Sequence, residues 1–531
     1  MAPRAADAVV IGSGPNGLVA ANALAEAGWE VLVLEAQPQV GGAVASAEVT
    51  APGFVSDLFS AFYPLAAASP VIRDLDLEEF GLDWCRAPDV LTHVMPDGRS
   101  VTLAGSPDRT AASVEEFGAG DGDAWLEMCA LWQRVRDPLL TSLFTPFPPV
   151  TGAARMARDL GAAGMLDFVR LALTPVRRMG QERFTGEGAP LLLTGNAMHS
   201  DVGPDASGSG MFGWLLAMLG QDVGFPVPQG GAGQFATALR RRAERYGAQV
   251  LTSTEVTSVE VRDGAAVGVT LMDGTSVRAR RAVLADVSAP DLYTRLLPRH
   301  SVPVKLQRDL SRFHWDNSTL KLNWALSGPI SWRSAPAARA GTVHLGVDND
   351  GFVDFAADLS VGRLPDHPFV LLGQMTTSDP TRSPLGTESA WAYTHVPHVA
   401  AASVTQMRGH VERVEELIET TAPGFGASVI ARHVQSPADL ESADANLVGG
   451  AINGGTSGLH QQLVLRPTPG LGRPETPIER LFLASAAAHP GGGVHGACGW
   501  NAARAALGSD GARGYLHRTL VRSAWGRLLR P

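Results

Sequence analysis

Positions 12–17 of the chain read GSGPNG, a glycine spacing that lets the main chain approach a phosphate group. Gly12 permits a tight turn, Gly14 leaves room for a pyrophosphate, and Gly17 lets a helix pack closely on a strand. Pro15 suits the first turn of that helix, where its missing N–H costs little. The start of a helix offers free N–H groups and partial positive charge to phosphates. The motif therefore predicts a pyrophosphate site.

The elements around this motif supply the required context. Residues 7–11 are apolar and β-branched, as in a buried strand, and residues 18–27 are rich in alanine and leucine, as in a helix. Residues 31–34 form a continuous apolar run, which is typical of a parallel strand buried on both faces. Glu35 follows this run, where a carboxylate can accept hydrogen bonds from ribose hydroxyls. Together these elements predict a dinucleotide-binding βαβ unit.

Further glycine segments distinguish between dinucleotides. Gly41 and Gly42 resemble the pattern of FAD enzymes related to amine oxidases, in which a second glycine pair meets the pyrophosphate. Residues 231–236 read GAGQFA, but Pro226 and Pro228 argue against the strand that a nicotinamide site would need. The three cysteines include no C-x-x-C pair, which argues against a redox-active dithiol and a structural zinc site. FAD is the predicted cofactor, and no metal site is expected.

A second pattern of strand, glycine-rich loop and helix lies near the C-terminal end. Residues 481–484 read LFLA, residues 491–496 read GGGVHG, and an alanine-rich run follows. A helix that starts beside a flavin ring can stabilise negative charge on the reduced ring. His489 and His495 flank the glycines and are the candidate catalytic residues, as proton shuttles near neutral pH. The alternative is that each makes a hydrogen bond that fixes the loop.

Other candidates are weaker. His199 lies in the expected substrate region, and residues 460–462 read HQQ in a glycine-rich segment. Several apolar side chains could line a substrate tunnel or belong to an ordinary core: Met198, Met211, Phe212, Trp214 and Met218.

Four segments resemble the phytoene-desaturase and carotenoid-isomerase-related family of flavoproteins, especially a branch labelled pyridine nucleotide-disulfide oxidoreductase domain-containing protein. They are residues 9–36, 374–397, 446–470 and 489–507, which include VVIGSGPNGLVAANALAEAGWEVLVLEA and HPGGGVHGACGWNAARAAL. The resemblance implies noncovalent FAD, a hydrophobic substrate, and dehydrogenation or isomerisation with hydride transfer to flavin N5. One departure is the LASA at residues 483–486, where the family usually has a glycine-containing turn and often an acidic residue.

The resemblance also implies positions for the cofactor. The residues at 12–17, 35, 41 and 42 would hold the ADP half, residue 256 would meet the adenine through its backbone, and residues 492–494 would lie against the isoalloxazine. The predicted cofactor-binding residues are Gly12, Gly14, Pro15, Asn16, Gly17, Glu35, Gly41, Gly42, Val256, Gly492, Gly493 and Val494.

The predicted fold class is α/β, with a Rossmann-like FAD-binding domain of the amine oxidase and phytoene desaturase type and a discontinuous α+β substrate domain. Residues 106–224 have a helical texture, whereas residues 250–285 alternate like strands around two Asp-Gly turns. The expected FAD-binding domain comprises residues 1–105, 225–300 and 431–531. The expected substrate-binding domain comprises residues 106–224 and 301–430.

Composition bounds the function. The 531 residues are 45% hydrophobic and 18% charged with a net charge of −10, which indicates a globular protein without a broad nucleic-acid surface. Few cysteines and no long apolar run favour a cytoplasmic protein. Residues 513–530 carry five arginines among apolar residues, which would suit peripheral membrane contact, a solvated helix or an oligomer contact. The oligomeric state is left open.

The main hypothesis is an FAD-dependent dehydrogenase, desaturase or isomerase that acts on a hydrophobic small molecule such as a polyene. Oxygen, a quinone or another acceptor would reoxidise the flavin. One alternative is a flavin amine oxidase that produces hydrogen peroxide. A second is an escort protein that binds lipophilic cargo on the same fold without turnover.

Overall fold

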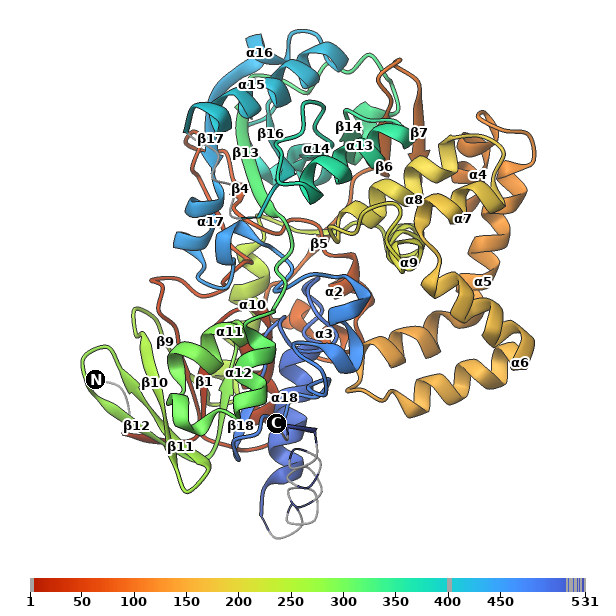
Figure 1. The fold of residues 1–531 in the computed structure, drawn as a ribbon. Helices are drawn as coiled ribbons and strands as arrows, with labels where there is room; N and C mark the ends of the chain where they lie inside the picture. The colour runs from red at the N-terminus through yellow and green to blue at the C-terminus, as the bar shows by residue number, and fades with distance from the viewer. Residues whose placement is uncertain are drawn as a thin grey trace.

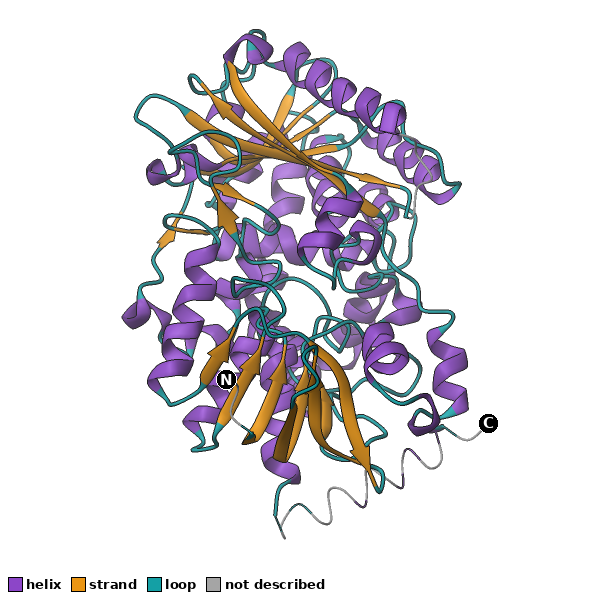
Figure 2. Ribbon diagram, turned by 90° about the vertical axis from the view of Figure 1, so that its left-hand side faces the viewer, coloured by secondary structure: helices purple, strands orange, loops and turns teal. Residues whose placement is uncertain are grey.

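Two seven-stranded sheets organise the computed structural model, which describes residues 4–398, residues 404–511 and six single residues beyond them. These single residues are 514, 519, 523, 525, 528 and 529. Figure 1 shows the first sheet at the bottom and the second at the top, and Figure 2 shows helices packed against both. Most of residues 513–530, the arginine-rich segment, lies outside the described residues.

The first sheet has the strand order β10-β11-β12-β1-β2-β9, and β18 pairs with β12. Its strands are β1 (Ala5–Ile11), β2 (Val31–Leu34), β9 (Gln249–Leu251), β10 (Val256–Arg262), β11 (Ala265–Leu271), β12 (Ser276–Ala285) and β18 (Leu481–Leu483). The pairs β1·β12, β1·β2, β2·β9 and β12·β18 are parallel, whereas β10, β11 and β12 form an antiparallel meander. All four residues of β2 are buried, as a continuous apolar run between two helical layers requires.

Helices cover both faces of the first sheet. Alanines of α1 (Pro15–Glu26) and α18 (Ala497–Ser509) pack with α10 (Gly233–Arg245) on one face. Small side chains let these helices approach closely: a Cβ on Gly499 of α18 would lie 1.9 Å from the carbonyl oxygen of Asn16 on α1. The other face is covered by the segment from α11 (Ala289–Asp291) through α12 (Val304–Leu310).

The second sheet has the strand order β17-β13-β16-β15-β14-β6-β7. Its strands are β6 (Asp89–Val94), β7 (Ser100–Leu103), β13 (Ser318–Leu326), β14 (Ala340–Leu345), β15 (Val370–Gln374), β16 (Glu388–Val396) and β17 (Val429–Gln435). Helix α15 (Val404–Thr421) covers one face. The other face packs against α8 (Gly188–Met198), α9 (Ser209–Asp222) and α13 (Asn349–Ser360). We call this second face, which packs against α8, α9 and α13, the inner face of the sheet. Figure 1 shows α8 and α9 beside it.

The helical part of the chain extends to one side of the second sheet (Figure 1). Its other helices are α4 (Pro107–Glu115), α5 (Asp121–Phe144), α6 (Val150–Leu173) and α7 (Val176–Arg183). Shorter elements connect the layers: α2 (Pro64–Ala68), α3 (Pro70–Arg73), α14 (Met375–Ser378), α16 (Phe425–Ser428), α17 (Pro437–Ala443), β3 (Ser46–Ala47), β4 (Ser56–Asp57), β5 (Trp84–Cys85) and β8 (Val227–Pro228).

The fold class predicted from the sequence is confirmed, and so are the βαβ unit and the meander. One strand, β12, both ends the meander and joins the parallel sheet, where two strands were expected. Within residues 1–105, β6 and β7 belong to the second sheet. Within residues 301–430, α12 packs on the first sheet. The expected domain boundaries stay predictions.

Candidate functional site

The turn between β1 and α1, which we call the glycine cradle, has glycine at three positions where a Cβ would lie too close to neighbouring atoms. Gly12 has a φ of 90°, and a Cβ there would lie 2.8 Å from the carbonyl oxygen of Asp286. A Cβ on Gly17 would lie 2.3 Å from the carbonyl oxygen of Gly12. A Cβ on Gly14 would lie 2.7 Å from Oδ2 of Asp286. The glycine spacing therefore reflects close packing between the motif and the residue that follows β12.

Glu35, at the end of β2, is joined to this turn. Its Oε2 accepts hydrogen bonds from the backbone N and Oγ of Ser13 at 2.8 and 2.6 Å. The second glycine pair, Gly41 and Gly42, packs against this turn, since Gly41 N donates to the Ser13 carbonyl at 3.0 Å. A Cβ on Gly42 would lie 3.2 Å from Gly14 Cα. The structure thus brings together the residues predicted to hold the ADP half.

Val256 approaches the same place from β10. The carbonyl of Glu35 accepts from Thr254 N at 2.7 Å, two residues before Val256. Val256 itself is buried. The backbone of Val256 therefore lies near the end of β2, where the predicted arrangement places the adenosine. The contact between Val256 and adenine stays a prediction.

The C-terminal glycine loop lies next to the first motif, because α18 packs against α1. Gly493 has a φ of 120°, and a Cβ there would lie 2.5 Å from Leu65 on α2. Val494 also has a positive φ, 51°, which is strained for a β-branched residue. Gly492 borders Asn453, whose carbonyl oxygen would lie 3.0 Å from a Cβ at that position. Close packing against Leu65 and Asn453 therefore fixes the conformation of this loop, as a binding surface for a planar ring requires.

Both candidate histidines are tied into this loop. Nε2 of His495 bonds to the Gly491 carbonyl at 3.1 Å, and its Nδ1 accepts from Ala497 N at 3.0 Å. Nε2 of His489 bonds to the Thr145 carbonyl at 3.1 Å. Burial lowers the pKa of each imidazole to about 4. These bonds support the loop-fixing alternative, and a catalytic role for His489 or His495 remains a prediction that they do not favour.

Arg466 is a functional residue that sequence reasoning missed. The residue is 1% exposed, and its guanidinium donates to backbone carbonyls of two segments, residues 453–456 and residue 486. These acceptors are Asn453, Gly454, Gly455, Thr456 and Ala486. Burial lowers its pKa to about 10. Arg466 therefore fixes two loops relative to each other and places a positive charge beside Gly491.

Two buried carboxyl groups next to the dinucleotide motif were also missed. Asp286 Oδ2 accepts from Gly17 N at 2.7 Å and so caps α1 from another strand. Asp444 Oδ2 would lie 3.2 Å from a Cβ on Gly42. Burial, and then the charges of Asp444 and Glu35, raise the pKa of Asp286 to about 7. Burial and Glu35 raise the pKa of Asp444 to about 6.

The raised pKa of Asp286 predicts a pH-dependent stability. The folded protein holds this proton up to about pH 7, whereas the unfolded chain releases it near pH 4. The contribution of this proton to stability is therefore complete below about pH 4 and is lost as the pH rises from there through about 7, so it is larger at pH 5 than at pH 8. For Asp286→Asn, we expect the difference in unfolding free energy between pH 5 and pH 8 to shrink by about 2 kcal/mol.

Urea unfolding of FAD-free protein at both pH values measures this difference. Asp354→Asn, on the exposed face of α13, is the matched control and should leave the difference unchanged. An unchanged difference in Asp286→Asn as well would show that Asp286 is ionised in the folded protein at pH 5.

The inner face of the second sheet carries a row of mostly polar side chains. His93, His344, Leu371, Tyr393 and Lys321 are successive cross-strand partners on β6, β14, β15, β16 and β13. Directly opposite residues share a face of the sheet, so all of these side chains point toward the layer that contains α8 and α9. The row is buried except for Tyr393, which is half-buried.

Lys321 is the cation of this face. Its Nζ donates to the Phe59 carbonyl at 3.3 Å and lies 4.3 Å from the centre of the Trp391 ring. Burial lowers its pKa to about 7. Lys321 can therefore exchange a proton near neutral pH, which makes it a better candidate for acid–base work than either histidine of the glycine loop.

The candidate residues that the sequence suggested in the helical region fall into two groups: some lie beside this face, and others belong to the hydrophobic core. His199, the residue after α8, bonds through Nε2 to Nε2 of His344 at 2.9 Å. Burial lowers the pKa of His199 to about 3, with a further contribution from His395. Met198, Trp214 and Met218 are buried core residues, whereas Met211 and Phe212 are half-buried. His460 is exposed and stacks on His314.

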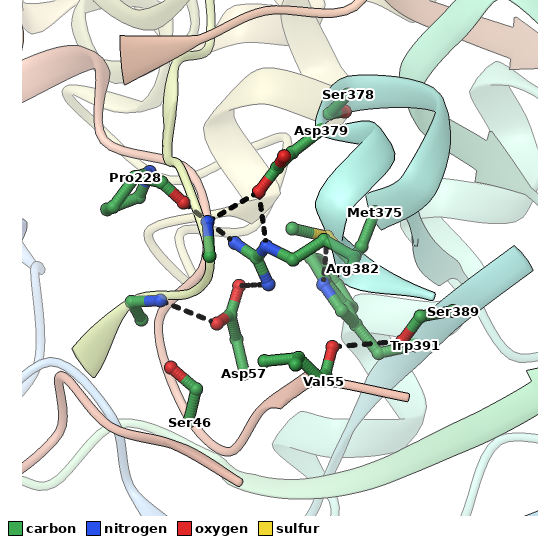
Figure 3. A network of polar contacts seen from close by, with 12 residues as sticks. Ser46, Val55, Asp57, Pro228, Met375, Ser378, Asp379, Arg382, Ser389 and Trp391 are labelled. Carbon is green, nitrogen blue, oxygen red and sulfur yellow. Dashed lines mark hydrogen bonds and ion pairs between the residues drawn. The ribbon is translucent and has the colours of Figure 1, made fainter. Parts of the chain in front are cut away.

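The second glycine motif, at residues 231–236, is filled by the protein itself (Figure 3). Asp57 Oδ1 accepts from Ala232 N at 2.8 Å, and Asp379 Oδ2 accepts from Gly230 N at 2.7 Å. Arg382 lies between the two carboxylates at 3.0 and 2.9 Å, and all three side chains are fully buried. The start of α10 thus binds internal carboxylates, which explains why this motif is no second dinucleotide site.

The residues at the first motif fit FAD. The glycine positions of the cradle have no room for side chains, and the cradle leads into the start of α1. The Glu35 carboxylate is bonded to its backbone at Ser13. The start of α18 borders the C-terminal loop. These are the features that bind a pyrophosphate, a ribose and a flavin ring. Among the described residues, no group of three or more histidine, cysteine or acidic side chains could hold a metal ion.

The profile of the family described as flavin containing amine oxidoreductase matches residues 16–352. The chain therefore belongs to this family and is an FAD-dependent oxidoreductase.

Individual relatives match over nearly the whole chain. Pyridine nucleotide-disulfide oxidoreductase domain-containing protein 2 of Mus musculus is 30% identical, over 94% of this chain and 92% of its own. A limonene dehydrogenase polypeptide of Castellaniella defragrans is 26% identical over 94% of both chains. The neurosporene-forming phytoene desaturase of Cereibacter sphaeroides is 25% identical over 95% of both chains. The resemblance found in the sequence is thereby confirmed.

Solved structures share the fold. An oxidoreductase from Methanosarcina mazei superposes with a TM-score of 0.63 at 15% identity, over 94% of this chain and 99% of its own. Within the described residues, no helix has both the length and the apolar character needed to cross a bilayer.

Proposed function

We propose that the enzyme oxidises or isomerises a hydrophobic, uncharged small molecule by hydride transfer to the flavin. The observation that supports this most directly is the inner face of β13 and β16. Its side chains include one cation and no carboxylate: Thr319, Lys321, Asn323, Trp391, Tyr393 and His395. On this face of the two strands a cationic amine would meet the charge of Lys321 and no carboxylate, since the nearest acidic groups, Asp57 and Asp201, lie on other elements. Two relatives are named for limonene and phytoene, which are hydrocarbons.

FAD supplies the reactive centre by accepting a hydride at N5. The chain's own groups then have three tasks. The tightly packed loop of residues 491–494 positions the ring, the aromatic side chains of β16 exclude water, and Lys321 holds or releases a proton. Such a reaction depends on orientation more than on an acid and a base, because hydride transfer needs close approach of the reacting atoms.

The amine oxidase alternative is favoured by the description of the family. Trp391 and Tyr393 stack at 5.9 Å, but Lys321 lies over the Trp391 ring, where an amine would be expected to bind. The escort alternative is disfavoured by the intact glycine cradle and by Glu35. We propose a cytoplasmic location, with peripheral membrane contact through residues 513–530 as a separate proposal that concerns mostly undescribed residues.

The electron acceptor separates the two enzymatic alternatives. The flavin is photoreduced without oxygen and then mixed with oxygen or with a water-soluble ubiquinone analogue. We expect the quinone to reoxidise the flavin at least about tenfold faster than oxygen does, as in a dehydrogenase. Rapid reoxidation by oxygen with one hydrogen peroxide formed per flavin would instead favour the oxidase. The oxidised enzyme is also mixed with a panel of primary amines. Reduction of the flavin by many of these amines would contradict the proposal.

A further inference from the structure

His395, near the end of β16, is a buried polar residue with both ring nitrogens unsatisfied. It has no exposed surface, and within the described part of the chain neither Nδ1 nor Nε2 has a hydrogen-bond partner. Among the other described histidines, five have one buried ring nitrogen without a partner rather than two: His93, His344, His398, His410 and His489. An imidazole buried in this way loses hydrogen bonds to water and gains none, unless a partner binds beside it.

Thr319 is the residue directly opposite His395 on β13. It is 3% exposed, and its Oγ1 also has no partner among the described residues. Directly opposite side chains on antiparallel strands start about 5 Å apart on the same face of the sheet. The two side chains nevertheless do not bond to each other. Three hydrogen-bonding atoms of this adjacent pair therefore lie on the inner face without a partner among the described residues, and at least one atom of each side chain remains available to a third group.

The surroundings of this pair belong to the predicted reaction site. Tyr393, half-buried on the same face, has its ring 5.6 Å from that of His395. Thr319 follows Ser318, which bridges to Ala451, and Asn453 two residues later borders Gly492 of the glycine loop. Neighbouring backbone segments thus connect His395 and Thr319 to the loop proposed to lie against the flavin.

We propose that His395 and Thr319 bind a neutral oxygen function of the substrate, a hydroxyl or a carbonyl, and that the substrate is a lipophilic molecule with one such polar group. The inference rests on the proposed function and narrows its substrate class. A neutral imidazole offers one donor and one acceptor, and a threonine hydroxyl offers both as well. A hydroxyl satisfies one atom on each side chain, whereas a pure hydrocarbon leaves all three buried atoms unpaired.

Matched ligands test this substrate class. The probes are two pairs that differ mainly in a hydroxyl group: limonene with perillyl alcohol, and farnesene with farnesol. Dissociation constants are measured by equilibrium dialysis against photoreduced, oxygen-free holoenzyme, in which no oxidation can occur. In at least one pair, we expect the alcohol to bind about tenfold more tightly than the hydrocarbon.

Variants assign this preference to the two residues. His395→Phe and Thr319→Val should each reduce the preference to below about threefold, since each removes one hydrogen bond. Thr394→Val is the control, because the Thr394 hydroxyl is also buried and unpaired but opposes Leu320 on the other face of the sheet. It should keep the preference of the wild type. Thr319→Val should also melt no lower than the wild type without ligand, because it removes an unpaired hydroxyl.

Two results would overturn the inference while the proposed function stands: a flavin-containing protein that binds neither alcohol more tightly than its hydrocarbon, or one that binds no member of either pair. A lower melting temperature in Thr319→Val would also count against it, because the hydroxyl would then have a partner in the protein. Flavin content is measured in the same samples, so that a protein without FAD identifies failure of the proposed function itself.

Discussion

Gly14→Val protein is expected to purify without FAD, with less than about 5% of the flavin of the wild type per chain. Even the Cβ of that valine would lie 2.7 Å from Asp286 Oδ2, and this carboxylate is itself bonded to Gly17 N. The side chain must therefore displace the Asp286 carboxylate and break its bond to Gly17 N at the start of α1. The effect is indirect, since the Cβ points toward Asp286, whereas the sequence alone suggested a direct collision with pyrophosphate.

The visible absorbance of the purified protein, divided by its absorbance at 280 nm, measures the loss of flavin. Gly508→Val is the matched control, because Gly508 is exposed on α18 and no described atom lies within 4 Å of the position that a Cβ there would take. It should retain full flavin content. Circular dichroism shows whether each variant folds. A folded Gly14→Val protein with normal flavin content would contradict the placement of the cofactor.

Arg382→Met is expected to lower the free energy of unfolding by about 3–5 kcal/mol. Arg382 lies between Asp57 and Asp379 with no exposed surface on any of the three side chains (Figure 3). Removing the guanidinium leaves two buried carboxylates without their hydrogen-bonded counter-charge. The loop before α10 should loosen as well, because Arg382 also donates to the Pro228 carbonyl and both carboxylates hold backbone N–H groups of that loop.

Urea unfolding of the holoenzyme measures this change. Arg99→Met is the control, since Arg99 also bonds to two acidic residues but is 53% exposed; its effect on the free energy of unfolding should be far smaller than that of Arg382→Met, because solvent screens the exposed pair. Replacing all three charges, as Arg382→Met with Asp57→Asn and Asp379→Asn, should restore part of the stability, because no buried charge remains unpaired. A loss below about 1 kcal/mol in Arg382→Met would show that water reaches the carboxylates.

The sequence was informative where the chemistry is local. The turn at residues 12–17, Glu35 and the second glycine pair lie within one βαβ unit, so their spacing alone predicted that they meet. Glu35 could be found because it ends a strand whose apolar run is evident. The meander was predictable for the same reason, since its Asp-Gly turns connect neighbouring strands.

Residues that meet across long separations could not be predicted. Asp286 caps α1 from 269 residues away, and Arg382 pairs with Asp57 across 325 residues. Neither has a recognisable spacing. Residues 89–103 fell within the expected FAD-binding domain, but β6 pairs with β14, far along the chain. His395 stands in an ordinary strand sequence, and only its unpaired nitrogens single it out.

The start of α1 must hold FAD if the enzyme works as proposed. Full-length protein, purified and then denatured with acid, should release FAD into the supernatant, where chromatography identifies it and gives a stoichiometry close to one per chain. Protein stripped of this flavin should regain it on incubation with FAD. A correctly folded chain that yields no FAD in the first step, and takes up none in the second, would contradict this central claim.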